Sequence, residues 1–200
     1  MLKIGLTGGI ASGKSTVSQL FHERHGIPVV DADVVAREVV TPGQSALAQI
    51  VGEFGESVLD SHGELDRQHI RDLIFSNDEQ RHKLEAILHP VIEREMLRQV
   101  SELKAPYCIL AIPLLVEANQ TNIVDRVLVI DTPEKVQIER LTRRDNIPLT
   151  QANKILSAQI DRETRLAVAD DIITNTGPIE DLTEQVDRLH AKYQRLSDSL

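Results

Sequence analysis

The 200-residue sequence contains one cysteine, no tryptophan and only five other aromatic residues, three Phe and two Tyr. The single thiol, Cys108, excludes an intrachain disulfide and a thiolate metal cluster, which favours a reducing, cytoplasmic compartment. Because Cys108 lies in a β-rich run, we expect it to be a small buried hydrophobic residue. The scarcity of aromatic side chains argues against a stacking surface for single-stranded nucleic acid.

Long apolar runs and net positive charge are also missing. No run approaches about 18 apolar residues and Met1 leads directly into a short β-rich segment, so the sequence predicts neither a membrane span nor a secretory signal. The net charge is −9, which argues against the basic face of a nucleic-acid binder. Between Arg140 and Arg165, however, six basic residues accompany three acidic ones, which indicates a small anionic ligand. We expect no nucleic-acid or membrane partner and favour a monomer.

Short β-rich runs alternate with helical patterns, which is typical of an α/β fold with a mainly parallel sheet. Such strands are covered on both faces and therefore read as continuous runs of Ile, Val and Leu. The expected strands are 2–7, 27–30, 107–112, 126–130 and 171–174. The last helix has the clearest apolar stripe, with three- and four-residue steps through Ile179, Leu182, Val186, Leu189, Tyr193 and Leu196.

A block of about 70 residues after the second strand shows helical patterns and no strand, which is longer than one crossover helix needs. The expected helices are 45–54, 66–75, 77–88 and 91–103, with turns at 60–63 and Ser76–Asn77. We interpret this block as an inserted helical subdomain. A second helical stretch, 134–167, carries the basic cluster, and we expect it to begin with Thr132 as cap and Pro133 in the first turn.

The strongest motif is Gly8-Gly9-Ile10-Ala11-Ser12-Gly13-Lys14-Ser15, between the first strand and an amphipathic pattern. It matches the phosphate-binding loop (P-loop), G-x-x-x-x-G-K-[ST], in the context that the motif requires. Glycines let successive N–H groups converge on phosphate oxygens, and the following helix adds its positive end. Lys14 then reaches the β- and γ-phosphates, and the Ser15 hydroxyl binds Mg²⁺. The sequence therefore predicts a site for a nucleoside triphosphate.

Three classes of P-loop protein remain to be distinguished. A GTPase normally carries N-K-x-D, but Asn153-Lys154 is followed by Ile155-Leu156. An ATPase motor usually has an acidic pair after an apolar strand, whereas the third strand here is followed by the single acid Glu117. A small-molecule kinase needs an acid for the acceptor hydroxyl, an acceptor pocket and arginines for the transferring phosphate. The sequence offers candidates for all three.

The candidate acids are Asp31 and Asp33, at the carboxyl end of the second strand, where open α/β sheets bind ligands. The alternative is that Asp31 caps a helix running to Glu38, with Asp33 in its first turn. Arg140, Arg143 and Arg144 have helical spacing, so we expect them on one face, binding phosphate. The alternative for them is a solvated face paired with local acids.

Taken together, these motifs resemble the dephospho-coenzyme A kinase family. The resemblance spans the chain in order, and its motifs are residues 5–15, Asp31-Ala32-Asp33, Leu88-His89-Pro90, residues 113–117, residues 140–145 and residues 173–177. It implies a three-layer α/β P-loop NTPase fold with a parallel five-stranded sheet. It also implies three parts: a nucleotide-binding core (1–38, 104–138 and 168–200), a helical acceptor-binding insertion (39–103) and an arginine-bearing lid (139–167).

The resemblance also implies that the γ-phosphoryl group of ATP, with Mg²⁺, moves to the ribose 3′-hydroxyl of dephospho-CoA, the last step of CoA biosynthesis. Asp33, Lys14 and Arg140 match the catalytic positions. The ATP-binding positions are Gly9, Ile10, Ala11, Ser12, Gly13, Lys14, Ser15, Thr16, Arg144 and Asn175. The acceptor-binding positions are Asp33, His89, Leu115 and Glu117. Another P-loop small-molecule or nucleoside monophosphate kinase, or a nucleotide-binding switch, is the alternative.

Two departures from the family pattern are visible: Ala11 stands where many members have Gly, and Val116 where Phe is frequent. We expect Ala11 to have a negative φ, because a left-handed Ala would cost about 1–2 kcal/mol. Two further residues have structural alternatives. His89 could simply end a helix before Pro90, and Glu117 could be a surface acid rather than a neighbour of Mg²⁺ or the acceptor.

Overall fold

The computed structural model describes residues 1–75 and 77–199. The chain forms two compact units, one made of Met1–Val30 with Leu103–Leu200 and the other of Asp31–Glu102. Within the part of the chain that the structure describes, no helix is both long and apolar enough to cross a bilayer. Ser76, at one of the predicted turns, lies outside the described residues.

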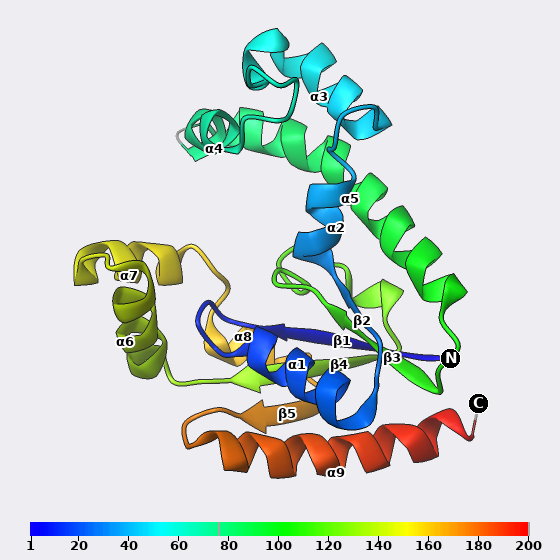
Figure 1. Ribbon diagram of the computed structural model, residues 1–200. Coiled ribbons are helices and arrows are strands. Elements are labelled where there is room, and N and C mark those ends of the chain that lie inside the picture. The colour runs from blue at the N-terminus through cyan, green and yellow to red at the C-terminus, as the bar shows by residue number, and fades with distance from the viewer. Residues whose placement is uncertain (76, 200) are drawn as a thin grey trace. The chain divides into compact units, whose positions relative to one another are not determined.

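The first unit is built on a five-stranded sheet with strand order β2-β3-β1-β4-β5 (Figure 1). The strands are β1 (Leu2–Gly8), β2 (Val29–Asp31), β3 (Tyr107–Ala111), β4 (Arg126–Asp131) and β5 (Asp171–Thr174). The central strand β1 pairs in parallel with both β3 and β4, and β4 pairs in parallel with β5. The predicted α/β class with a five-stranded parallel sheet is confirmed, and each strand lies within two residues of its predicted bounds.

One face of the sheet forms the main core with α1 (Lys14–His25) and α9 (Ile179–Ser197), which pack against each other and contact β1 and β3. Alternate residues of β1 point into this core, as do Phe21 of α1 and Tyr193 of α9. Phe21 meets Tyr107 of β3 edge to face, with ring centroids 6.4 Å apart. Such an aromatic pair stabilises the fold by about 0.5–1.5 kcal/mol beyond the contribution of its buried area. The predicted stripe of α9 is therefore its core face, except for Ile179, which is 46% exposed.

The other face of the sheet holds Cys108, which is fully buried as expected. Burial raises the pKa of its thiol to about 11. The expectation that every strand is covered on both faces is wrong for β5, where Ile172 is 48% exposed. The reason is topological: β5 is an edge strand, and α8 (Arg162–Ala167) packs against its neighbour β4.

The second unit is helical, with one short 3₁₀ turn, η1 (Glu56–Val58). Its α-helices are α2 (Ala32–Glu38), α3 (Ser45–Phe54), α4 (Arg67–Phe75) and α5 (Asp78–Glu102). The predicted helix end at Pro90 is wrong, because α5 continues through it. Pro90 removes the hydrogen bond to the Ala86 carbonyl. Buried Leu84 before it and Met96 after it hold both halves of α5 in the packing of the unit.

The segment 134–167 forms three helices, α6 (Glu134–Asp145), α7 (Leu149–Ser157) and α8. Asn146 adopts a left-handed conformation, with φ 52°, and ends α6. The predicted Thr132 cap is wrong. Pro133 is the N-cap of α6, and the buried Thr132 hydroxyl instead lies within hydrogen-bond distance of the main-chain oxygens of Ser12 and Asn175. A short 3₁₀ turn, η2 (Thr121–Ile123), precedes β4.

Candidate active site

The phosphate loop runs from the end of β1 to the start of α1, and two of its glycines are required by close packing. At Gly13, the N-cap of α1, φ is 96°, and a Cβ atom would collide with Nδ2 of Asn175. At Gly9, a Cβ atom would collide with Nε2 of Gln137 and lie 3.2 Å from Nη1 of Arg165. Side chains from distant segments therefore fill the space that these glycines leave open.

Ala11 has φ 55°, which corrects the expectation of a negative φ. The cause is the turn that contains it: the Ser12 N–H donates to the Gly9 carbonyl at 3.1 Å, which makes Ala11 the third residue of a four-residue turn. A type II turn requires a positive φ at that position. Ala11 thus carries a backbone strain of about 1–2 kcal/mol.

The Ala11→Gly substitution is expected to raise the free energy of unfolding by about 0.5–1 kcal/mol, because lost strain exceeds the entropy that glycine adds to the unfolded chain. Urea unfolding without nucleotide measures this change in the free energy of unfolding. The control is Ala191→Gly at an exposed site within α9. There, glycine should lower stability by about 1 kcal/mol. Destabilisation by Ala11→Gly would contradict the strain.

The loop is arranged as an anion site. The N–H groups of Ala11 and Gly13 donate to no acceptor in residues 1–75 and 77–199. The first turn of α1 contains no acidic residue, so no carboxylate of that turn offsets the positive end of the helix dipole. Amides that converge at a helix N-terminus bind phosphate groups. Residues 9–16, the predicted ATP contacts in this segment, lie along this loop and the start of α1.

Ser15 is exposed in the first turn of α1. Among the residues that the structure describes, no group of three or more His, Cys, Asp or Glu side chains could hold a metal ion. Mg²⁺ does not need such a cage, since one or two protein oxygens with substrate phosphates and water satisfy it. The Ser15 hydroxyl beside the phosphate loop fits this donor set.

Asn175 supports the loop from the end of β5. It is 5% exposed, its Nδ2 donates to the Ser12 carbonyl at 2.6 Å, and its own N–H donates to the Asp131 carbonyl at 2.8 Å. Arg140 Nη2 donates to the Asn175 main-chain and side-chain oxygens, at 3.3 and 3.2 Å. The structure thus joins Arg140, Asn175 and the loop. The predicted adenine contact of Asn175 stays a prediction.

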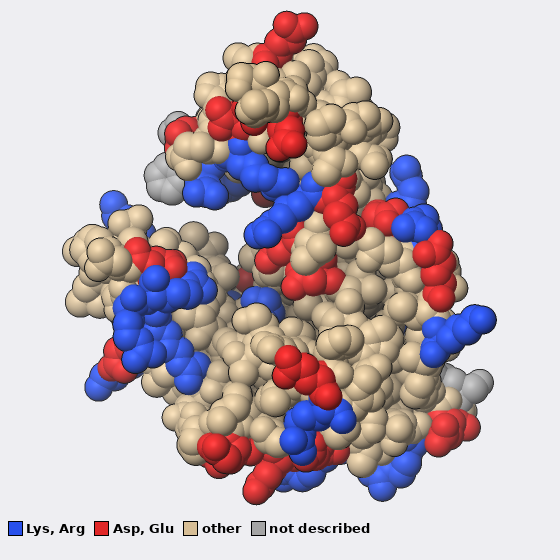
Figure 2. Space-filling model, viewed as in Figure 1, with Lys and Arg blue, Asp and Glu red and all other residues tan. Residues whose placement is uncertain are grey.

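The other two arginines of α6, Arg143 and Arg144, do not share the contact of Arg140 with Asn175. Arg144 donates two hydrogen bonds to Asp145, at 2.7 and 2.9 Å, which raise the pKa of Arg144 and lower that of Asp145. Arg143 is exposed. Figure 2 shows lysine and arginine side chains gathered over α6. The expected three-arginine cluster therefore divides into Arg140, directed toward the loop, and Arg144, held by a local acid.

Several buried polar atoms of the first unit have no hydrogen bond, and one of them belongs to Arg165, which lies beside Gly9. Of the residues described, Ser12 Oγ, both Glu117 carboxylate oxygens and Arg165 Nε are buried without a hydrogen bond. The Glu117 carboxylate lies 3.7 Å from Arg165 Nη2. Buried polar groups without hydrogen bonds are costly, and a catalytic role or a bound water or ion commonly explains them. Glu117 is therefore not a surface acid, and the alternative that the sequence left open for it is wrong.

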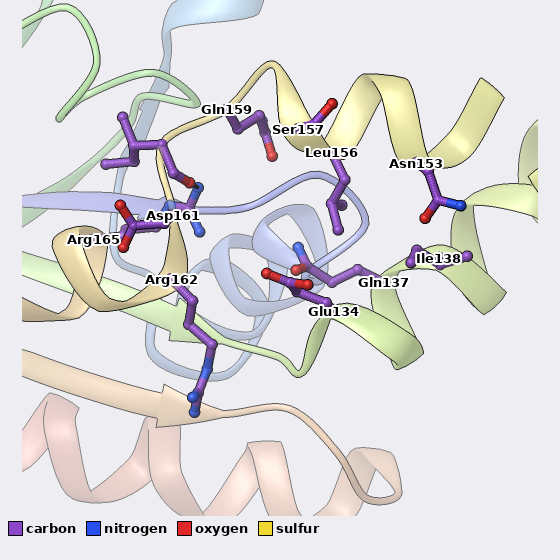
Figure 3. Close-up of a pocket in the computed structure, with 11 residues that line it drawn as sticks. Glu134, Gln137, Ile138, Asn153, Leu156, Ser157, Gln159, Asp161, Arg162 and Arg165 are labelled. Atoms are coloured by element: carbon purple, nitrogen blue, oxygen red, sulfur yellow. Dashed lines mark hydrogen bonds between the residues drawn. The ribbon is translucent and has the colours of Figure 1, made fainter. Parts of the chain in front are cut away.

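Two glutamines that sequence reasoning missed also contact the loop. Gln137 of α6 donates to the Ile10 carbonyl at 2.7 Å, and the Ile10 N–H donates to Oε1 of Gln159 at 2.8 Å. Both line a pocket of about 390 Å³ between α6, α7 and the start of α8 (Figure 3). No spaced motif identifies these residues: Gln137 lies on the amphipathic helix α6, where glutamines usually face solvent, and Gln159 lies in the connection between α7 and α8.

In the second unit, Asp31 is the N-cap of α2 and accepts a hydrogen bond from the Asp33 N–H at 2.8 Å. This confirms the capping alternative for Asp31 and places Asp33 in the first helical turn. His89 is exposed on α5. Leu115, in the first unit, is fully buried and packs against Gly5 of β1. The predicted acceptor roles of His89 and Leu115 stay predictions.

Comparison with known proteins gives a consistent result. A family model described as dephospho-CoA kinase matches residues 2–181. A dephospho-CoA kinase of Coxiella burnetii is 49% identical over 200 residues, covering 100% of both chains. One of Vibrio vulnificus is 48% identical over 196 residues, covering 98% of this chain and 97% of its own. A solved dephospho-CoA kinase structure from Campylobacter jejuni has a TM-score of 0.72 at 29% identity, covering 96% of this chain and 97% of that one.

Proposed function

We propose that this chain, which belongs to the dephospho-CoA kinase family, transfers the γ-phosphoryl group of ATP to the ribose 3′-hydroxyl of dephospho-CoA, yielding CoA and ADP. The observation that carries the proposal is the phosphate loop. Within the part of the chain that the structure describes, it combines two N–H groups that donate to no acceptor, a helix N-terminus with no acidic residue in its first turn, and nearby buried polar atoms without hydrogen bonds. Phosphoryl transfer depends mainly on positioning and electrostatics, which such a loop supplies.

In the proposed mechanism, the loop amides hold the phosphates and Lys14 places its ammonium group at the β- and γ-oxygens. The oxygen of the 3′-hydroxyl forms a bond to the γ-phosphorus while the bond between that phosphorus and the β–γ bridging oxygen breaks. Asp33 accepts the proton of the 3′-hydroxyl in this step. Arg140 leaves Asn175 and stabilises the charge on the transferring group. Mg²⁺, held by Ser15 and phosphate oxygens, would supply positive charge that offsets phosphate repulsion.

The acceptor side of the site rests on the family resemblance. We assign acceptor binding to the insertion 39–103, with His89, and to Glu117 and Leu115 after β3. Glu117 has the clearest physical support, because its buried carboxylate lacks hydrogen-bond donors that an acceptor hydroxyl or bound water would provide. The segment 139–167 is assigned as the lid. A monomer in the cytoplasm that binds neither nucleic acid nor membrane stays a prediction from the sequence.

The direct experiment measures ADP release from Mg²⁺ and ATP with and without dephospho-CoA, and the mass of the product. We expect acceptor-dependent turnover and a gain of about 80 Da on dephospho-CoA, one transferred phosphoryl group. ATP binding without stimulation by dephospho-CoA would overturn the acceptor. Nucleoside monophosphates and small alcohols would then be screened as acceptors. If none supported turnover, the remaining alternative would be a nucleotide-binding regulatory switch.

The Arg140→Met substitution is expected to lower kcat by about 10²–10³, because it removes a charged donor to the transferring phosphoryl group. Steady-state kinetics with saturating substrates checks this. The matched control is Arg188→Met, which removes an equal charge from an exposed site on α9. An Arg140→Met enzyme with kcat within about threefold of the parent would remove Arg140 from the chemical step.

A further inference from the structure

The turn Gly9–Ser12 has two possible arrangements of its central peptide, and the structure holds the more strained one. Ala11, the third residue, has φ 55°, and Ile10 is not left-handed, which is the sign pattern of a type II turn. A type I turn differs mainly by a half rotation of the Ile10–Ala11 peptide and places the third residue near about −90° in φ. Type I would relieve the strain on Ala11, so another interaction must favour type II.

Gln137 supplies that interaction. Gln137, on α6, is 4% exposed, and its Nε2 donates to the Ile10 carbonyl at 2.7 Å. This carbonyl belongs to the peptide that would rotate. A half rotation would turn the oxygen away from Gln137 and leave a buried amide donor unpaired, which is costly.

Gln159 fixes the preceding peptide. Its Oε1 accepts from the Ile10 N–H at 2.8 Å. Arg165 anchors the connection that carries Gln159, because its Nη2 donates to the Ile160 carbonyl at 2.8 Å. In Figure 3, Gln137 and Gln159 approach the loop from α6 and from the connection before α8. Both peptide groups of Ile10 are thus held by side chains, and neither hydrogen bond depends on a ligand.

The orientation of this peptide decides where an N–H group points. In a trans peptide, the carbonyl and the following N–H point in opposite directions. Since Gln137 holds the Ile10 oxygen, the Ala11 N–H points away from Gln137, and it donates to no acceptor in the described chain. In the type I arrangement, this N–H would point toward Gln137 instead.

We propose that Gln137 is a positioning residue for ATP. Gln137 selects the type II arrangement of Gly9–Ser12 and so directs the Ala11 N–H to the phosphates. Gln159 fixes the peptide at the start of the turn. The proposal rests on the loop's proposed binding of ATP but is independent of the acceptor. The type II arrangement that Gln137 selects carries the strain on Ala11. The role of Gln137 should therefore shrink when residue 11 is glycine.

The test is a double-mutant cycle between Gln137→Met and Ala11→Gly, read out as the Kd for ATP with Mg²⁺ by calorimetry. Met has similar length and volume but no N–H donor. With Ala11 retained, Gln137→Met is expected to raise Kd about 10-fold, as the strain drives the turn to type I. In the Ala11→Gly background, the increase should be at most about threefold, because glycine adopts either arrangement readily.

The control is Gln151→Met, at an exposed position on α7, which should leave Kd within about twofold of the parent. An equal loss in both backgrounds would mean that Gln137 only packs, and would overturn the proposal, as would no loss with Ala11 retained. If Gln137→Met does not fold, Gln137→Asn replaces it, since the shorter amide keeps polarity but does not reach the Ile10 carbonyl. Because no acceptor is present, failure of the dephospho-CoA assignment leaves this test unaffected.

Discussion

The Asp33→Asn substitution is expected to lower kcat by about 10²–10⁴ while leaving the Kd for ATP within about threefold. The amide has the same shape as the carboxylate but does not accept a proton from the 3′-hydroxyl. The Asp33 main-chain N–H still donates to Asp31, so the start of α2 is preserved. Steady-state turnover and calorimetric ATP binding separate the two effects. A kcat within about fivefold of the parent would remove Asp33 from the mechanism.

The matched control for this variant is Asp31→Asn. It removes the same charge two residues earlier, and Asn is as good an N-cap as Asp. We expect kcat and the free energy of unfolding to stay near the parent values. Asp31→Ala, by contrast, should lower stability by about 1 kcal/mol through loss of the cap. A large fall in kcat for Asp31→Asn would show that charge at the start of α2, rather than Asp33 itself, is required.

Local signals made much of the fold predictable. The strand at 171–174 and the helix at 45–54 have the predicted bounds, because each apolar pattern ends before a residue type that commonly ends such an element, Asn175 and Gly55 respectively. The phosphate loop was predictable for the same reason, since all its motif residues lie within eight positions. Asp31 as a cap also follows from local chemistry, and the structure confirms it.

Helix boundaries that depend on packing were not predictable. Pro90 is a strong local signal for a helix end, but α5 continues because both of its halves are held by buried contacts. The division of 134–167, by contrast, has local signals: Asn146 ends α6, and Pro148 precedes α7 as its N-cap. Thr132 resembled a cap, yet its hydroxyl lies beside main-chain oxygens of distant segments.

The supporting half of the candidate site was hidden from sequence reasoning. Ile10 contacts Gln137 and Gln159 across 127 and 149 residues, and neither glutamine belongs to a spaced motif. The positive φ of Ala11 belongs to the turn that these two side chains contact. The motif therefore predicts which atoms bind phosphate, whereas the side chains proposed to set the direction of those atoms are brought to the loop by tertiary structure.

The Lys14→Met substitution is expected to lower kcat/KM by about 10³–10⁴, among the largest effects in the molecule. Lys14 begins α1 directly after Gly13, whose left-handed conformation and contact with Asn175 fix the point where the side chain leaves the loop. In the proposed mechanism, its ammonium group offsets phosphate charge in the bound substrate and more strongly in the transition state, where charge shifts to the β–γ bridging oxygen. Both kcat and ATP affinity should therefore fall.

Two controls separate this local effect from net charge. Lys135→Met removes an equal charge from an exposed site in the first turn of α6, and its kcat/KM should stay within about threefold of the parent. Lys14→Arg keeps the charge, but a planar guanidinium does not replace a compact ammonium group in the loop, so activity should remain at least about tenfold reduced. If Lys14→Met and Lys135→Met lost activity equally, long-range attraction of ATP would explain the loss. A far greater loss at Lys14 alone would place the requirement at the phosphate oxygens.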